Sequence, residues 1–166
     1  MTGLSTPFVR APDRYPSSVG FSPLGLVVSL AVLAPNLLLV AFPPRTAISR
    51  VRIPLLLTVL ERGGQALCLV VPAITEPGET RWWWAVPVAA AVSTYYALWG
   101  RYLMTGRIAS ALYRPLWRVP VPMAILPVVA FAAAAAWLGN GWIALAALVL
   151  AAGHIPASVL IAREFG

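Results

Sequence analysis

The sequence has no lysine, one cysteine, one histidine and few charged residues of either sign. A lone cysteine, Cys68, excludes an internal disulfide and a cysteine-cluster metal site. A lone histidine, His154, excludes a histidine-rich desaturase site and a haem held by two histidines of this chain. Only 10% of the residues are charged, whereas a soluble domain has about 25%. The composition therefore excludes an ordinary water-soluble domain.

Long apolar stretches take the place of charge. The 166 residues are 60% hydrophobic, with a mean hydropathy of +0.83. Five stretches approach the ~20 residues that a transmembrane helix needs, at residues 22–42, 53–74, 82–104, 119–138 and 141–162. We predict an all-α, polytopic integral membrane protein, with one five-helix membrane domain over residues 22–162. Residues 1–21 lack the pattern of a cleaved signal peptide and are predicted to form an extracytoplasmic segment.

Arginine is distributed unevenly among the segments that join these stretches. One side of the predicted membrane has Arg45, Arg50, Arg52, Arg101, Arg107, Arg114, Arg118 and Arg163. The other side has Arg10, Arg14 and Arg81. The positive-inside rule then places the N-terminus outside and the tail, residues 163–166, in the cytoplasm of a cell whose inner (plasma) membrane holds the protein. The +7 net charge reflects these loops and does not indicate nucleic-acid binding. The arginine-only, alanine-rich composition is typical of a bacterial genome of high GC content.

Residues 101–118 have a basic, amphipathic pattern. Arg107, Arg114 and Arg118 share one face of a hypothetical helix, and apolar residues recur on another. Such a helix would lie on the cytoplasmic surface and bind anionic lipid. The alternative is an ordinary arginine-rich loop.

Glu61 and Arg62 lie in the middle of the second apolar stretch. An unpaired charge at bilayer depth costs between ~2.5 and more than 10 kcal/mol, so such residues usually pair with others or have a function there. With ~1.5 Å of rise per residue, polar residues from three further stretches fall at a similar depth, roughly 8–14 Å below the inner surface. These residues are Asn36, Tyr95, Tyr96 and His154.

Helical spacing supports a shared interior for these residues. Gln65 follows Glu61 by one turn, and Ser158 follows His154 by one turn. Pro35 precedes Asn36 directly, and a proline in a helix frees the carbonyl four residues earlier and kinks the axis. We therefore predict a polar cavity inside the bundle, near the cytoplasmic leaflet.

The residue types favour binding or modification of a lipid or another apolar small molecule. Glu61 and His154 are candidates for general base and acid, and Arg62 for holding a phosphate or carboxylate. Asn36, Gln65, Tyr95, Tyr96 and Ser158 would contact the ligand. Two alternatives remain: a structural or accessory subunit of a membrane complex, and a small proton-coupled transporter that works as a homodimer. Membrane lipids are the expected partners, and no metal, cofactor or nucleic acid is expected.

Overall fold

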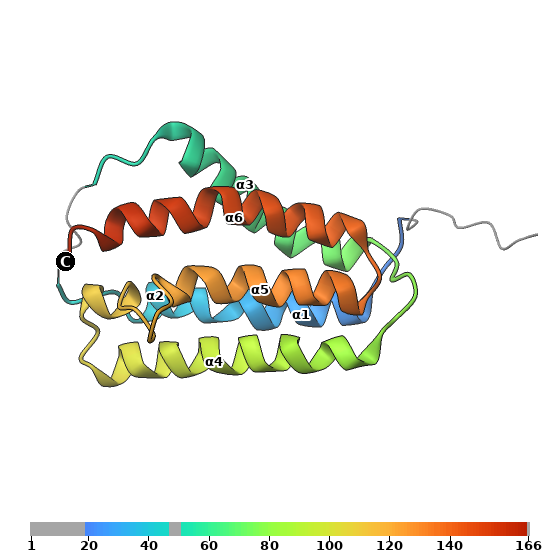
Figure 1. The fold of residues 1–166 in the computed structure, drawn as a ribbon, viewed down its shortest axis with the longest axis horizontal. Coiled ribbons are helices and arrows are strands. Elements are labelled where there is room, and N and C mark those ends of the chain that lie inside the picture. The colour runs from blue at the N-terminus through green and yellow to red at the C-terminus, as the bar shows by residue number, and fades with distance from the viewer. Residues whose placement is uncertain (1–18, 47–50, 166) are drawn as a thin grey trace, which may run out of the picture.

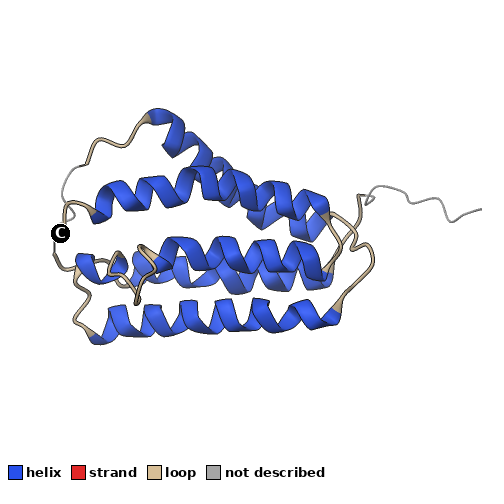
Figure 2. Cartoon of the chain, in the orientation of Figure 1, coloured by secondary structure: helices blue, strands red, loops and turns tan. Residues whose placement is uncertain are grey.

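The structure, a computed structural model, describes residues 19–46 and 51–165. In this part of the chain the regular elements are all helical, as predicted (Figure 2). Two isolated β-bridges join short segments between them. The α-helices are α1 (Pro23–Leu33), α2 (Leu38–Ala41), α3 (Leu55–Ile74), α4 (Ala85–Met104), α5 (Pro122–Trp137) and α6 (Gly141–Ala162). Three short 3₁₀ helices are η1 (Ala34–Leu37), η2 (Trp82–Trp84) and η3 (Ala109–Leu112).

Three helical segments are long and apolar enough to cross a membrane. These are Pro23–Ala41, Leu55–Ile74 and Gly141–Phe165. The fourth predicted stretch forms a shorter apolar helix, α5, of 16 residues. All five predicted stretches are thus largely helical, and the described part of the chain is all-helical with three segments able to span a membrane.

α5 and α6 form the centre of the bundle. Figure 1 shows α6 between α3 and α5, and α4 packed on the opposite side of α5. Ala133, Ala134 and Ala135 are buried there, so the alanine run of α5 is a close-packing surface. In Figure 1 α3 crosses α6 obliquely, and its first turns diverge from the rest of the bundle.

At two prolines of the helical segments, Pro35 and Pro72, a hydroxyl group binds the carbonyl that the proline leaves free. Pro35 lies in η1, which divides the first apolar stretch into α1 and α2. The Tyr96 hydroxyl donates to the Ala31 carbonyl, at 3.0 Å. In the same way the Ser29 hydroxyl donates to the Cys68 carbonyl, four residues before Pro72, at 2.8 Å. Free carbonyls inside a membrane need such donors.

The surface helix over residues 101–118 is not present. α4 ends at Met104. Shortly after it, Gly106 (φ 77°) and Arg107 (φ 62°) have left-handed backbone, through which a helix cannot continue. Only η3 follows, and its apolar residues are buried against protein. Arg107, Arg114 and Arg118 therefore share no helical face, and the loop alternative describes the segment. The fourth stretch also begins later than predicted, at Pro122, because Leu116 and Val119 pair with each other.

The two ends of the bundle differ. At the end that contains the start of α6, hydrogen bonds tie the connecting segments together, among them Gly78 N to Leu138 O (2.8 Å) and Asn140 Nδ2 to Thr75 Oγ1 (2.8 Å). The opposite end holds most of the described arginines, whereas Arg10, Arg14 and Arg50 lie outside the described residues. Two cavities lie toward that arginine-rich end.

Candidate functional site

Glu61 and His154 contact each other directly. His154 Nδ1 lies 2.7 Å from Glu61 Oε1, within hydrogen-bonding distance. Each side chain is about 23% exposed, so the pair is mostly covered by protein and still accessible from one side. The two residues come from different helices and are 93 positions apart in the sequence. The Glu61 carboxylate thus has a partner, and that partner is His154 and not the adjacent Arg62.

Two glycines make this contact possible by allowing α3 and α6 to approach closely. A Cβ atom on Gly64 would collide with the backbone of Leu150, and one on Gly153 would collide with the backbone of Leu60 and Glu61. Small residues at such crossings are the usual way for membrane helices to pack backbone against backbone. Gly153 directly precedes His154, so the crossing holds the imidazole beside the Glu61 carboxylate.

Seven of the eight predicted catalytic and ligand-binding residues line a single cavity of about 340 Å³. We call it the inner cavity. It brings together α1–α2, α3, α4 and α6, the four stretches whose polar residues share a depth. The seven residues are Asn36, Glu61, Arg62, Gln65, Tyr95, His154 and Ser158.

The lining of the inner cavity contains a second hydrogen-bonded pair, Tyr95 and Asn36. The Tyr95 hydroxyl donates to Asn36 Oδ1, at 2.7 Å. Tyr95 also packs edge-to-face on Trp99, which in turn packs edge-to-face on Tyr102. This aromatic row is buried and fixes the position of the Asn36 amide.

Tyr96 does not belong to the cavity. Its side chain is 47% exposed, and its hydroxyl binds the Ala31 carbonyl. Successive residues of a helix point about 100° apart, so Tyr95 and Tyr96 cannot both face the same interior. Cys68 is fully buried between α3 and α1 and does not line the cavity either.

Arg62 lines the inner cavity from its exposed side and has no carboxylate partner among the described residues. Gln65 and Ser158 likewise form no side-chain hydrogen bond within the described chain. The cavity therefore contains the hydrogen-bonded pair of Glu61 and His154 beside three polar side chains that form no hydrogen bond with the described protein.

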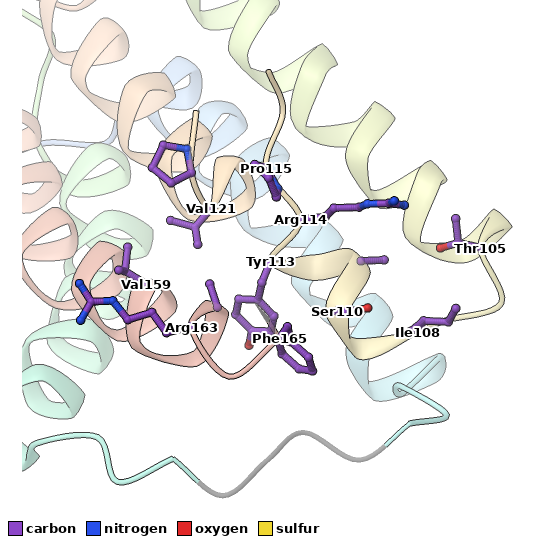
Figure 3. A pocket seen from close by; sticks show the side chains of 13 residues that line it. Thr105, Ile108, Ser110, Tyr113, Arg114, Pro115, Val121, Val159, Arg163 and Phe165 are labelled. Atoms are coloured by element: carbon purple, nitrogen blue, oxygen red, sulfur yellow. The ribbon is translucent and has the colours of Figure 1, made fainter. Parts of the chain in front are cut away.

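A second and larger cavity, about 610 Å³, lies next to the inner one at the arginine-rich end (Figure 3). We call it the outer cavity. Tyr113 and Val121 line both cavities, and the Tyr113 ring stacks on Phe165 with centroids 5.7 Å apart. Burial raises the pKa of the Tyr113 hydroxyl, and the negative charge of Glu61 raises it further, so this group stays neutral at physiological pH.

Sequence reasoning did not single out Tyr113 or Val121 as site residues. Trp99 resembles an interfacial aromatic in sequence yet is buried. Tyr113 and Val121 follow irregular backbone, and Val121 itself has a φ of 40°. The periodicity of apolar residues predicts helices and strands, so it could not identify these two positions.

The three arginines predicted to bind surface lipid have different surroundings. The Arg107 guanidinium lies over the Phe42 ring, 6.0 Å from its centroid. Arg114 lines the outer cavity, and Arg118 is exposed in the loop before α5. They do not form one patch on one element.

Chemically, the inner cavity offers a carboxylate that orients an imidazole. With Nδ1 held by Glu61, the remaining ring nitrogen of His154 is available to accept or donate a proton. No group of three or more His, Cys, Asp or Glu side chains within residues 19–46 and 51–165 is arranged to hold a metal ion. The chain matches no family model, no curated protein and no solved structure.

Proposed function

We propose that all five apolar helices cross the plasma membrane, with the N-terminus outside. α4 has 20 residues and begins after three tryptophans, and α5 has 16 residues packed between α4 and α6. Arg81 pairs with Glu79 at one end, at 3.7 Å, whereas the arginines at the opposite end have no carboxylate partner in the described chain. That asymmetry supports the cytoplasmic assignment of the arginine-rich end.

Cysteine labelling tests this orientation. In a Cys68→Ser background, we expect a membrane-impermeant maleimide added to intact cells to label Glu79→Cys and to leave Trp117→Cys unlabelled. Both positions are exposed, at 84% of the side chain for Glu79 and 97% of the residue for Trp117, so both should react once the membrane is opened. Labelling of Trp117→Cys alone in intact cells would reverse the assignment.

We infer that the inner cavity binds a lipid or another amphipathic small molecule. The observation that carries this inference is the gathering of polar residues from four apolar segments around the Glu61–His154 pair. In a network that served packing alone, each polar side chain would have a hydrogen-bond partner, because an unmade hydrogen bond in an apolar setting costs about 1–3 kcal/mol. Arg62, Gln65 and Ser158 instead present unused groups to the cavity, which favours a ligand over a purely structural role.

The Glu61–His154 pair also gives this site the means to act on its ligand. A carboxylate that orients an imidazole is the arrangement that general base catalysis uses. The same pair would transfer a proton in a transporter. Ligand binding is common to both, so it is the property to test first.

The test is native mass spectrometry of protein extracted gently enough to retain bound lipid. We expect wild type to retain a lipid or small molecule and Glu61→Gln to retain about tenfold less, because hydrogen bonds to charged groups contribute about 1.5–3 kcal/mol. The matched control is Glu79→Gln, a carboxylate 84% exposed at the opposite end, which should behave as wild type. An intact wild type with no bound molecule, together with loss of a partner subunit in Glu61→Gln, would replace this function with the structural one.

A further inference from the structure

The outer cavity lies at the arginine-rich end of the bundle, and the inner cavity follows it toward the bundle interior. The outer cavity lies among the end of α4, the η3 segment, the start of α5 and the end of α6. The inner cavity lies deeper along α3 and α6, at Glu61 and His154. Tyr113 and Val121 form the wall that both share.

The outer cavity has two arginines and no acidic residue in its lining, whereas the inner cavity has Arg62 together with Glu61. Arg114 and Arg163 both line the outer cavity, and Figure 3 shows them on opposite sides of the stacked Tyr113 and Phe165 rings. Neither pairs with a carboxylate in the described part of the chain. The remaining lining is largely apolar, with Ile108 and Val159 among it.

This order of surfaces matches the order of groups along a phospholipid. A phosphate lies nearest the aqueous phase, polar ester groups lie a few ångströms deeper, and acyl chains follow. The cavities offer free guanidinium groups nearest the cytoplasmic end and hydrogen-bonding groups further in. Guanidinium groups bind phosphate oxygens strongly, and their charge favours an anionic lipid over a zwitterionic one.

We propose that the outer cavity binds the headgroup of an anionic phospholipid through Arg114 and Arg163, while the ester region of the same molecule reaches the inner cavity past Tyr113. The proposal rests on the proposed function of the inner cavity and adds the class of ligand. Tyr113 is suited to the boundary between the two cavities because its hydroxyl is neutral. It also lies close enough to Glu61 for the charge of that carboxylate to raise the pKa of the hydroxyl.

The experiment titrates detergent-solubilised protein with short-chain phosphatidylglycerol and with phosphatidylcholine of the same chain lengths, and measures both occupancies by native mass spectrometry. We expect wild type to prefer phosphatidylglycerol. Arg114→Gln and Arg163→Gln should each reduce phosphatidylglycerol binding about fivefold. They should reduce phosphatidylcholine binding by less, because the choline charge of that lipid offsets the charge of its phosphate. Arg81→Gln, at the opposite end and paired with Glu79, is the matched control and should bind both lipids as wild type does.

Three further variants separate the failure of this proposal from the failure of the proposed function. Glu61→Gln should reduce binding of both lipids, because it alters the inner cavity. If it does so while the double variant Arg114→Gln, Arg163→Gln keeps the wild-type preference, the inner site stands and the headgroup assignment is wrong. Loss of the preference in Arg62→Gln alone would place the phosphate in the inner cavity and would also overturn it. Retention of neither lipid by wild type would reject both.

Discussion

Gly153→Ala should lower the free energy of unfolding by about 3 kcal/mol and separate Glu61 from His154. The added Cβ would occupy the position of the Leu60–Glu61 backbone, and backbone cannot move aside as the end of a flexible side chain can. Helix propensity acts in the opposite direction, since alanine is favoured over glycine by about 1 kcal/mol in a helix. The steric effect is the larger one, so the net result is destabilisation.

Gly63→Ala is the matched control, because it lies in the same crossing pair of helices and has nothing within 4 Å of its Cβ position. It should leave stability unchanged or raise it by up to about 1 kcal/mol. Thermal unfolding of wild type and both variants in one detergent, followed by tryptophan fluorescence, compares them directly. Equal stability of the two variants would mean that α3 and α6 do not pack through Gly153 as the structure has it.

The helices were the most predictable part of this protein. Apolar stretches of about 20 residues leave little choice of secondary structure in a bilayer, because every backbone group must be satisfied within the segment. The effect of Pro35 was also predictable, since it follows from the missing N–H group. By the same rule Pro72 leaves the Cys68 carbonyl without its helical donor. The group that binds this carbonyl, the Ser29 hydroxyl, lies 39 residues away in the sequence.

The composition of the inner cavity was predictable from depth, but its pairings were not. Asn36, Glu61 and His154 agree in depth along the membrane normal, and this coordinate can be read from sequence. Rotation about each helix axis cannot be read with the same accuracy, and this is why Tyr96 was assigned with Tyr95. The partner of Glu61 depends on Gly153, whose role as a close contact becomes visible only when α3 and α6 are placed together.

The outer cavity had no signal in the sequence. Most of its lining comes from the segment between α4 and α5, where Arg107, Trp117 and Val121 all have positive φ. Non-glycine residues seldom adopt this conformation, and the local amino-acid composition does not predict it. The amphipathic pattern of residues 101–118 left both a surface helix and an ordinary loop open, because periodicity was the only evidence available there.

A double-mutant cycle at Glu61 and His154 should show a coupling free energy of about 2 kcal/mol. His154→Phe alone leaves the carboxylate without its 2.7 Å partner in an apolar bundle, and breaking such a pair costs about 3 kcal/mol. Glu61→Leu alone costs less, because an imidazole can remain neutral. The double variant removes both polar groups and should recover most of the stability of wild type, since apolar replacement of a buried pair is often neutral.

The same four proteins separate stability from function when lipid retention is measured beside unfolding in detergent. If the pair serves a ligand, the double variant should unfold like wild type and still retain about tenfold less lipid, because the hydrogen bonds of the inner cavity are absent. Purely additive changes in unfolding free energy would show that the contact contributes no coupling. A double variant with restored stability and full lipid retention would assign Glu61 and His154 to helix packing, and the ligand would then depend on the groups that remain, Asn36, Arg62 and Gln65.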